Sequence, residues 1–373
     1  MITLKKLTTK KEMQAFVKFP FTLYKNNKYW VPPIINDELE VLNKDLNPAF
    51  ENAEATYYGA YKDSKMVGRI AVIINWYEVQ TQKIKKIRFG WFDFIDDLEV
   101  SKTLLDKVFE VGRQNNLEFA EGPLGFSNLD KVGVLTSGFD VLGTMATWYN
   151  YEYYQEHYKQ LGFEVGKEYV ENTFPFSNVN PQFFEKAGKL IRNRYELKPI
   201  NFTNTEDVMP YVDQMFDLFN ETYSVLSSFI PVSEKQKEYF KKKYLYFINP
   251  EYIKFIQDKD GKLITFGIVM PSFSEALQKA KGKLFPFGFI HMLRAKKKHD
   301  TILFYLIGID PKYQNKGVTA VLFSEYFKSL KGKPIETCIR TPELANNIPV
   351  RQMWKHFDPQ IFATRCTFVK NIE

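Results

Sequence analysis

The stretch ILFYLIGIDPKYQNKGVTAVLFSEYFKSL, residues 302–330, decides the fold. Its first part, 302–309, is almost unbroken apolar and aromatic, which is typical of a strand covered on both faces. Asp310-Pro311 ends that strand, because proline cannot donate to a β-ladder. From about Gly317 onward the apolar residues recur at helical spacing and give the segment one core-facing side. The stretch therefore predicts a strand, a tight polar loop and a helix.

The loop between this strand and this helix predicts an anion site. Gln314-Asn315-Lys316-Gly317-Val318-Thr319 would direct several unpaired N–H groups toward one spot, where the helix dipole adds partial positive charge. Phosphate suits such a spot best. Gly317 lets the backbone come close to the ligand, and Lys316 adds a cation. The alternative is an ordinary joint whose glycine only relieves a turn.

The spacing Ile309-x-Pro311-x-x-Gln314-x-x-Gly317-x-Thr319-Ala320-x-Leu322 resembles the acyl-CoA pyrophosphate motif of the GNAT (GCN5-related N-acetyltransferase) superfamily. That motif is usually Gln/Arg-x-x-Gly-x-Gly/Ala before a helix. Thr319 stands where the second small residue is usual, and its amide can still donate. The resemblance implies that residues 314–319 hold the diphosphate of acyl-CoA. It also implies that the pantetheine arm bonds the backbone near Ile307 and Ile309.

Length and composition limit the number of domains and the classes of protein to consider. A chain of 373 residues has room for two domains, and 34 Phe and 22 Tyr supply a large core. Two cysteines, Cys338 and Cys366, and four histidines argue against a disulfide framework or a metal site. The net charge of +7 is spread along the chain, which does not indicate nucleic-acid binding. Without a signal sequence or a long apolar run, we expect a cytoplasmic protein that is not an integral membrane protein.

The first half of the chain repeats the same order of elements. Strand patterns at 55–61 and 66–75 flank a turn, and a strand at 85–94 precedes a helix at 101–113. A second hairpin, 252–257 with 263–270, follows about 200 residues after the first, which indicates a tandem duplication. We therefore expect an α/β fold with a mixed α+β sheet, built from two tandem GNAT-like acyl-CoA N-acyltransferase domains. Their expected ranges are 1–178 and 179–373.

The first copy differs at the corner where the phosphate loop would lie. Asp96-Asp97-Leu98-Glu99 replaces the glycine-bearing turn. Three carboxylates at a helix N-terminus complement the dipole themselves and repel a phosphate. We therefore expect no CoA binding of the usual kind in this half. Tyr158-Lys159-Gln160-Leu161-Gly162-Phe163, in a helix expected over 149–161, resembles the fourth GNAT motif, but Tyr158 is interpreted here as a packing residue.

Catalytic candidates surround the next strand of the second half, expected at 335–339. Glu336, Cys338 and Arg340 share one face by period two. If that face borders the cleft, Glu336 could take a proton from an amine; otherwise it is a structural carboxylate. Cys338 as an acyl-carrying nucleophile is a weaker option, because nothing places a histidine beside it.

The usual proton donor of the family is missing. Asn347 matches by spacing the motif asparagine that bonds the pantetheine arm, but seven residues later Trp354 stands where the family has its tyrosine. An indole N–H cannot supply a proton at neutral pH. Three explanations stay open. Tyr305, Tyr313 or another nearby group substitutes, the thiolate leaves unaided, or the domain binds acyl-CoA without fast transfer.

An insertion at 271–300 separates the second hairpin from the deciding strand. Its aromatic run, 284–293, is followed by the basic segment 294–299. Such a run fits a lid over an acyl chain or a contact with a lipid surface, and it also fits a packed helix or strand with a solvated end.

These observations lead to one functional expectation and one alternative. The protein is expected to move an acetyl or longer acyl group from CoA to a small-molecule amine by direct transfer, without a metal. The alternative is a non-catalytic acyl-CoA-binding or regulatory protein. The acceptor, the acyl length and the oligomeric state leave no readable mark in the sequence.

Overall fold

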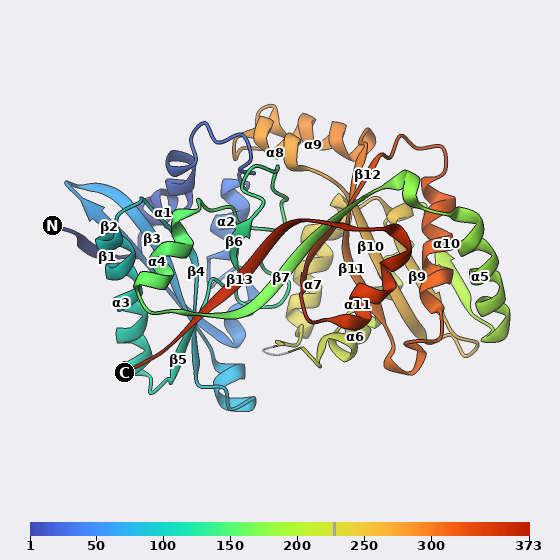
Figure 1. Ribbon diagram of the computed structural model, residues 1–373, viewed down its shortest axis with the longest axis horizontal. Coiled ribbons are helices and arrows are strands. Elements are labelled where there is room, and N and C mark those ends of the chain that lie inside the picture. The colour runs from blue at the N-terminus through green and yellow to red at the C-terminus, as the bar shows by residue number, and fades with distance from the viewer. Residues whose placement is uncertain (227–228) are drawn as a thin grey trace.

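The computed structural model describes residues 1–226 and 229–373, and its strands form a single 13-stranded mixed sheet (Figure 1). Along the sheet the order is β1-β2-β3-β4-β5-β13-β7-β12-β11-β10-β9-β8, with β6 paired to β13. The expected α/β architecture with a mixed sheet is confirmed.

Each half follows the same plan: a strand, two helices, a hairpin, a strand leading into a helix, and a strand parallel to that one. The elements of the first half are β1 Thr3–Leu7, α1 Lys10–Leu23, α2 Ile35–Val41, β2 Ala53–Lys62, β3 Lys65–Asn75, β4 Lys86–Phe94, α3 Leu98–Gln114, β5 Phe119–Gly122, β6 Val134–Ser137, α4 Tyr153–Gln160 and β7 Glu164–Pro175. Those of the second half are α5 Pro181–Arg194, β8 Lys198–Asn201, α6 Val212–Tyr223, α7 Glu234–Tyr244, β9 Ile253–Gln257, β10 Leu263–Pro271, α8 Ser274–Ala280, α9 Gly288–Lys297, β11 Thr301–Ile309, α10 Val318–Leu330, β12 Thr337–Leu344, α11 Ile348–Met353 and β13 Gln360–Asn371.

Two long strands exchange partners between the halves. β7 comes from the first half but pairs with β12, and β13 ends the chain but pairs with β5. The two strands also pair with each other antiparallel, from Gln360 opposite Thr173 to Val369 opposite Glu164. Figure 1 shows them crossing the middle of the molecule side by side. The boundary expected after residue 178 stays a prediction, and the exchange makes the two halves interdependent.

The organising stretch of the second half is packed between two cores. Ile302 and Phe304 belong to the core beneath α10 and α5, whereas Leu303 lies in the core beneath α6 on the other face. Coverage of both faces explains the unbroken apolar run of this strand. The predicted strand, loop and helix are therefore present.

Local side chains and prolines set where two helices begin. The helix expected over 149–161 begins at Tyr153, because the Asn150 side chain bonds the backbone N–H and C=O of Leu135 at 2.6 and 3.1 Å and holds that segment extended. α6 begins at Val212, just after Pro210, whose ring is tolerated only in the first turn of a helix.

Candidate functional site

A buried aspartate shapes the loop that follows β11. The Asp310 carboxylate accepts from the Lys312 amide at 2.8 Å and from Lys262 Nζ at 2.7 Å. Its backbone carbonyl accepts from the amides of Tyr313 and Gln314 at 2.8 and 3.2 Å. Burial would raise the pKa of Asp310, but the hydrogen bond from Lys262 and that from the Lys312 amide outweigh it and hold the pKa below 3.8. Asp310 therefore fixes the start of the loop as an ionised carboxylate.

Within residues 1–226 and 229–373, the amides of Gly317, Val318 and Thr319 donate no hydrogen bond. The first backbone hydrogen bond at this end of α10 runs from the Ala320 amide to the Gly317 carbonyl, three residues earlier, at 2.9 Å. Gly317 has φ +78°, in the region that favours glycine, and Asn315 has φ +60°. Residues 314–317 are exposed. The loop thus presents unpaired donors at a helix N-terminus, which is a place suited to an anion.

Lys316 and two tyrosines lie together beside this turn. Lys316 Nζ lies 5.4 Å from the centre of the Tyr313 ring and 5.7 Å from that of Tyr195. The Arg194 guanidinium lies 5.3 Å from the same Tyr195 ring. Arg194 and Tyr195 come from the end of α5, which packs along α10. Sequence reasoning missed this contribution, because nothing in the α5 sequence shows that the helix would lie beside the loop.

The equivalent corner of the first half closes on itself. The Asp97 side chain accepts from the Glu99 amide at 3.1 Å, and its carbonyl accepts from the amides of Val100 and Ser101 at 3.0 and 3.4 Å. Lys62 pairs with Asp97 at 3.2 Å, and His157 contacts Asp96 at 3.0 Å. The amides of Asp97 and Glu99 are thus no longer available to an anion, since Asp97 N–H donates to the Ile95 carbonyl at 2.7 Å, and the carboxylates add negative charge.

Next to the loop of the second half, β11 and β12 form a fork. Their parallel pairing runs only from Thr301 opposite Thr337 to Phe304 opposite Arg340. Beyond that point β12 continues to pair with β7, while β11 stays with β10. The predicted position of the pantetheine arm lies along this unpaired part of β11.

Protein groups already contact the two backbone carbonyls assigned to the pantetheine arm. The Ile307 carbonyl accepts from Tyr223 Oη at 3.2 Å, and the Ile309 carbonyl accepts from Gln314 Nε2 at 3.1 Å. A carbonyl oxygen has two lone pairs, so each retains one acceptor position. Tyr223 is a neighbour of the fork that no sequence pattern selects. The roles of Ile307 and Ile309 with the pantetheine arm stay predictions.

Tyr305 lies at the branch point of the fork. It is the extra residue of a β-bulge, since Val269 of β10 pairs with Phe304 and Ile268 pairs with Leu306. Its carbonyl accepts from Thr341 Oγ1 of β12 at 3.2 Å. Burial, with a smaller effect from the charge of Asp130, raises the pKa of Tyr305 to about 12. The phenol therefore keeps its proton at neutral pH and can donate it.

A loop of the first half, residues 127–130, contacts the core beneath α6 in the second half. Leu129 packs against the core beneath α6, and Asn128 Oδ1 accepts from the Ile230 amide at 3.1 Å. Asp130 follows, and its carboxylate accepts from the Ser127 amide at 2.8 Å. Burial raises the pKa of Asp130 despite that bond. The site therefore has a titratable group from the first half near Tyr305, which the sequence did not reveal.

Glu336 is not brought together with Tyr305. It is exposed and precedes β12, so four residues at about 3.3 Å each separate it from the level of the fork at Arg340. Its backbone bonds Asp300 and Phe176, both at 2.7 Å. Its assignment as a base stays a prediction that this placement does not favour.

Asn347 caps α11, and its side chain accepts from the Val350 amide at 3.4 Å. Trp354 is only 2% exposed, and its ring lies 4.9 Å from that of Phe304 in the core beneath α10.

Cys338 is buried as well, and burial raises the pKa of its thiol to about 12, which disfavours the thiolate that a nucleophile needs. Tyr158 of the first half is likewise a core residue, since its ring stacks on Phe368 with centroids 4.1 Å apart.

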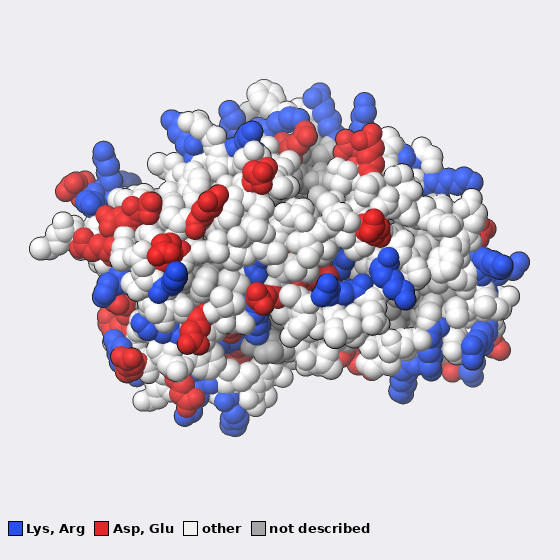
Figure 2. Space-filling view, in the orientation of Figure 1, with Lys and Arg blue, Asp and Glu red and all other residues white. Residues whose placement is uncertain are grey.

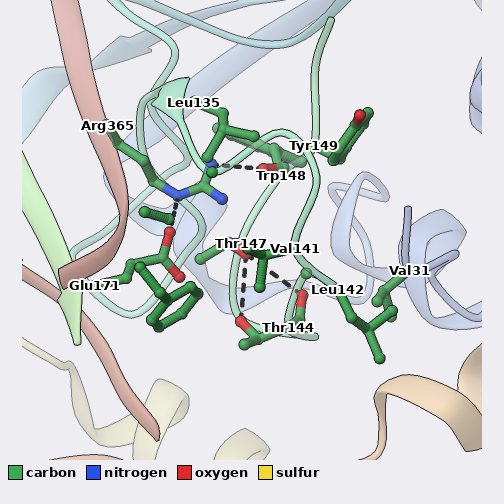
Figure 3. A pocket seen from close by; sticks show the side chains of 14 residues that line it. Val31, Leu135, Val141, Leu142, Thr144, Thr147, Trp148, Tyr149, Glu171 and Arg365 are labelled. Carbon is green, nitrogen blue, oxygen red and sulfur yellow. Dashed lines mark hydrogen bonds and ion pairs between the residues drawn. The ribbon is translucent and has the colours of Figure 1, made fainter. Parts of the chain in front are cut away.

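Two hollows lie near the exchanged strands. In the first, Arg365 of β13 points at Glu171 of β7, and Nε and Oε1 are 2.5 Å apart (Figure 3). Its volume of about 10 Å³ is about what one water molecule needs. The second is a cleft of about 360 Å³ beside α11, lined by Arg340, Arg351 and Lys355 among others. Basic side chains gather over α11 in Figure 2.

Comparison with known proteins identifies the fold. A tandem GNAT protein from the clavulanic acid biosynthesis pathway matches all of this chain and 99% of its own, with a TM-score of 0.60 and 9% identity. A GCN5-related N-acetyltransferase from Sphaerobacter thermophilus matches all of this chain and 96% of its own, with a TM-score of 0.52 and 8% identity. The chain therefore has a tandem GNAT-like fold, as the motif at 309–322 implied. No family model matches the sequence.

Two relatives are similar in sequence over most of their length. Protein YghO of Escherichia coli (strain K12) is 23% identical over 315 residues, 84% of this chain and 80% of its own. The bacterial ceramide synthase of Caulobacter vibrioides (strain NA1000 / CB15N) is 23% identical over 310 residues, 82% of this chain and 80% of its own. In the part of the chain that the structure describes, no helix combines the length and the apolar character needed to span a bilayer.

Proposed function

We propose that the protein is an N-acyltransferase that binds acyl-CoA in its second half and transfers the acyl group directly to a small-molecule amine. The observation that carries this proposal is the turn at residues 314–319, which is exposed over 314–317 and has three unpaired amides beside the fork of β11 and β12. Of the three corresponding amides of the first half, those of Asp97 and Glu99 are already bonded, and three carboxylates lie at this corner. One donor site per chain follows from this asymmetry.

The residues present suit the donor. The amides of Gly317, Val318 and Thr319 would hold the diphosphate, with Lys316 and Arg194 supplying positive charge at the rim. The unpaired edge of β11 would receive the pantetheine arm, and Asn347 would approach it from α11. In this arrangement the thioester would come close to the level of Tyr305.

The proposed chemistry is a direct attack. The amine nitrogen forms a bond to the thioester carbonyl carbon, and the carbon–sulfur bond then breaks. The amine gives up one proton to a base or to water, and Tyr305 gives one proton to the leaving thiolate. Its pKa of about 12 exceeds that of a thiol, so the transfer relies on the thiolate being desolvated and on proton return to Tyr305 from water. Asp130 is a candidate base in addition to Glu336, because its raised pKa reflects burial beside this face.

The relative named as a ceramide synthase supports an amine acceptor and a long acyl group. A ceramide is an amide of a fatty acid and a long-chain amino alcohol, so its synthesis forms an amide bond. At 23% identity this likeness selects which substrates to test first. We therefore propose long-chain acyl-CoA donors and amino-alcohol acceptors as the first candidates.

The burial of Trp354 favours a second candidate function, a non-catalytic acyl-CoA-binding protein. The two functions predict the same binding but different turnover. Calorimetry with CoA, acetyl-CoA and longer acyl-CoAs tests the donor site, and the absence of heat with all of them would refute both functions. Release of free CoA thiol on addition of amines then separates them. Thiol release that requires both amine and protein supports the transferase, and binding without such release across the amine panel supports the binding protein.

A further inference from the structure

The insertion between β10 and β11 is anchored on its inner side. Leu277 and Ala280 of α8 are buried with Val31 and Ile34 of the first half, and Met292 of α9 packs against the same cluster. Figure 1 shows α8 and α9 along the upper edge of the molecule, above the region where the halves meet. The segment therefore has a fixed position and a fixed outer side.

That outer side is apolar. Phe285 and Phe287 are 76% and 69% exposed, and Leu293 is 53% exposed. Phe289, which is 37% exposed, lies with its ring 5.6 Å from that of Phe285, so the two form one cluster. The sequence left open whether this run is a lid, a lipid contact or a packed helix. In the structure the run is a turn followed by the helix α9, and the two phenylalanines of the turn, Phe285 and Phe287, are its most exposed side chains.

The exposed apolar surface continues past the C-terminal end of α9. Lys296 Nζ donates to the Tyr246 carbonyl at 2.6 Å, and Asn249 Nδ2 donates to the Lys296 carbonyl at 3.1 Å. These bonds hold the 3₁₀ turn Leu245–Phe247 beside the helix. Tyr246 and Phe247 of that turn are 53% and 46% exposed. An apolar surface of this kind marks an interaction site in a soluble domain.

The same edge is strongly basic. Residues 279–298 contain seven cations and no carboxylate: Lys279, Lys281, Lys283, Arg294, Lys296, Lys297 and Lys298. Of these, only Lys279 has an ion-pair partner in the described part of the chain, Glu275 at 3.1 Å. Figure 2 shows blue side chains standing along this upper edge on both sides of projecting white ones. Exposed aromatic residues with uncompensated cations around them complement a surface that is apolar inside and anionic outside.

We propose that the outer side of residues 281–298 docks on an anionic lipid bilayer, with Phe285 and Phe287 entering the headgroup–acyl boundary and the cations contacting lipid phosphates. This inference is separate from the proposed acyl transfer, because docking needs neither acyl-CoA nor the turn at 314–319.

Vesicle flotation tests the proposal, with phosphatidylcholine vesicles that contain or lack phosphatidylglycerol. Wild-type protein is expected to float with the anionic vesicles and not with the neutral ones. The double variant Phe285→Ser/Phe287→Ser should lower the partition coefficient at least about tenfold, because two largely exposed aromatic side chains lose their burial in lipid. Its matched control is Leu46→Ser/Leu190→Ser, which removes two apolar side chains that are 55% and 68% exposed elsewhere.

A second pair of variants tests the contribution of the cations to vesicle binding. Lys297→Glu/Lys298→Glu should lower binding to anionic vesicles about 25-fold or more, since each cation near such a surface contributes about fivefold. Arg351→Glu/Lys355→Glu makes the same change in net charge beside α11 and should have a much smaller effect. Calorimetry with CoA on the phenylalanine variant should give wild-type affinity, which separates docking from the donor site.

Three outcomes would overturn the proposal: no flotation of the wild-type protein with anionic vesicles, equal loss in the variants and their controls, or self-association through this surface. In the last case the wild-type protein would not bind lipid, and the phenylalanine variant would have a lower mass than the wild type in sedimentation equilibrium. All substituted side chains are exposed or solvent-facing, so unchanged thermal unfolding is expected and confirms that each variant is folded.

Discussion

Replacing Gly317 with valine tests the donor site most specifically. At φ +78° a residue with a Cβ costs about 1–2 kcal/mol, and a β-branched one costs more. The new Cβ would also lie 3.2 Å from Cδ1 and Cγ1 of Ile191 in α5, so that side chain would have to shift by a few tenths of an ångström. If the turn relieves this strain by leaving the left-handed region, it withdraws at least one amide from the diphosphate.

The expected loss of affinity follows from that amide. A hydrogen bond to a charged group is worth about 1.5–3 kcal/mol, and 1.4 kcal/mol is a factor of ten, so CoA should bind roughly 10- to 150-fold more weakly. Gly332→Val is the matched control. Gly332 has φ +77° and nothing within 4 Å of its missing Cβ, so it carries similar backbone strain without any contact to the turn. Calorimetry should show weak CoA binding for Gly317→Val and wild-type binding for Gly332→Val. Equal affinities for both variants would refute the assignment of the turn.

Asp97→Ala should lower the free energy of unfolding by about 0.5–2 kcal/mol through loss of a helix cap, while calorimetry shows unchanged CoA affinity; a large loss of affinity would mean that the first half binds the donor. Tyr305→Phe should slow thiol release about 10²- to 10⁴-fold with little change in CoA affinity, and a wild-type rate would exclude Tyr305 as the acid. Trp354→Ala should cost about 3–5 kcal/mol of stability in urea unfolding because it empties a buried aromatic site, and a small cost would contradict its place in the core. The pKa of Asp310 is lowered from 3.8 in the folded protein, so the ionised carboxylate stabilises the fold above that pH. This contribution is lost as the pH falls through the lowered pKa. Asp310→Asn should remove this part of the acid dependence of the free energy of unfolding, measured in urea.

Local patterns predicted the part of the fold that carries the donor site. The buried strand, the proline that ends it and the glycine before the helix are signals within about 30 residues, and each acts through its own backbone. The sequence also predicted the acidic corner of the first half, because Asp97 caps the helix that it precedes. In both cases the residues that decide the structure are neighbours in sequence.

Long-range pairings were beyond the sequence. Nothing in the alternation of β7 or β13 specifies that each pairs across to the other half, because the same pattern suits either partner. For the same reason, the contact of Tyr223 with the Ile307 carbonyl could not be foreseen from spacing. The aromatic run at 284–293 was ambiguous until the inner side of α9 was found to be occupied by Met292 and Ala295.

A crystal structure of the protein with an acyl-CoA tests the central claim most directly. The account predicts the diphosphate on the amides of Gly317, Val318 and Thr319, the pantetheine arm along the unpaired edge of β11, and no ligand at residues 97–99. A diphosphate bound elsewhere, with the turn at 314–319 unchanged and without a ligand, would contradict it.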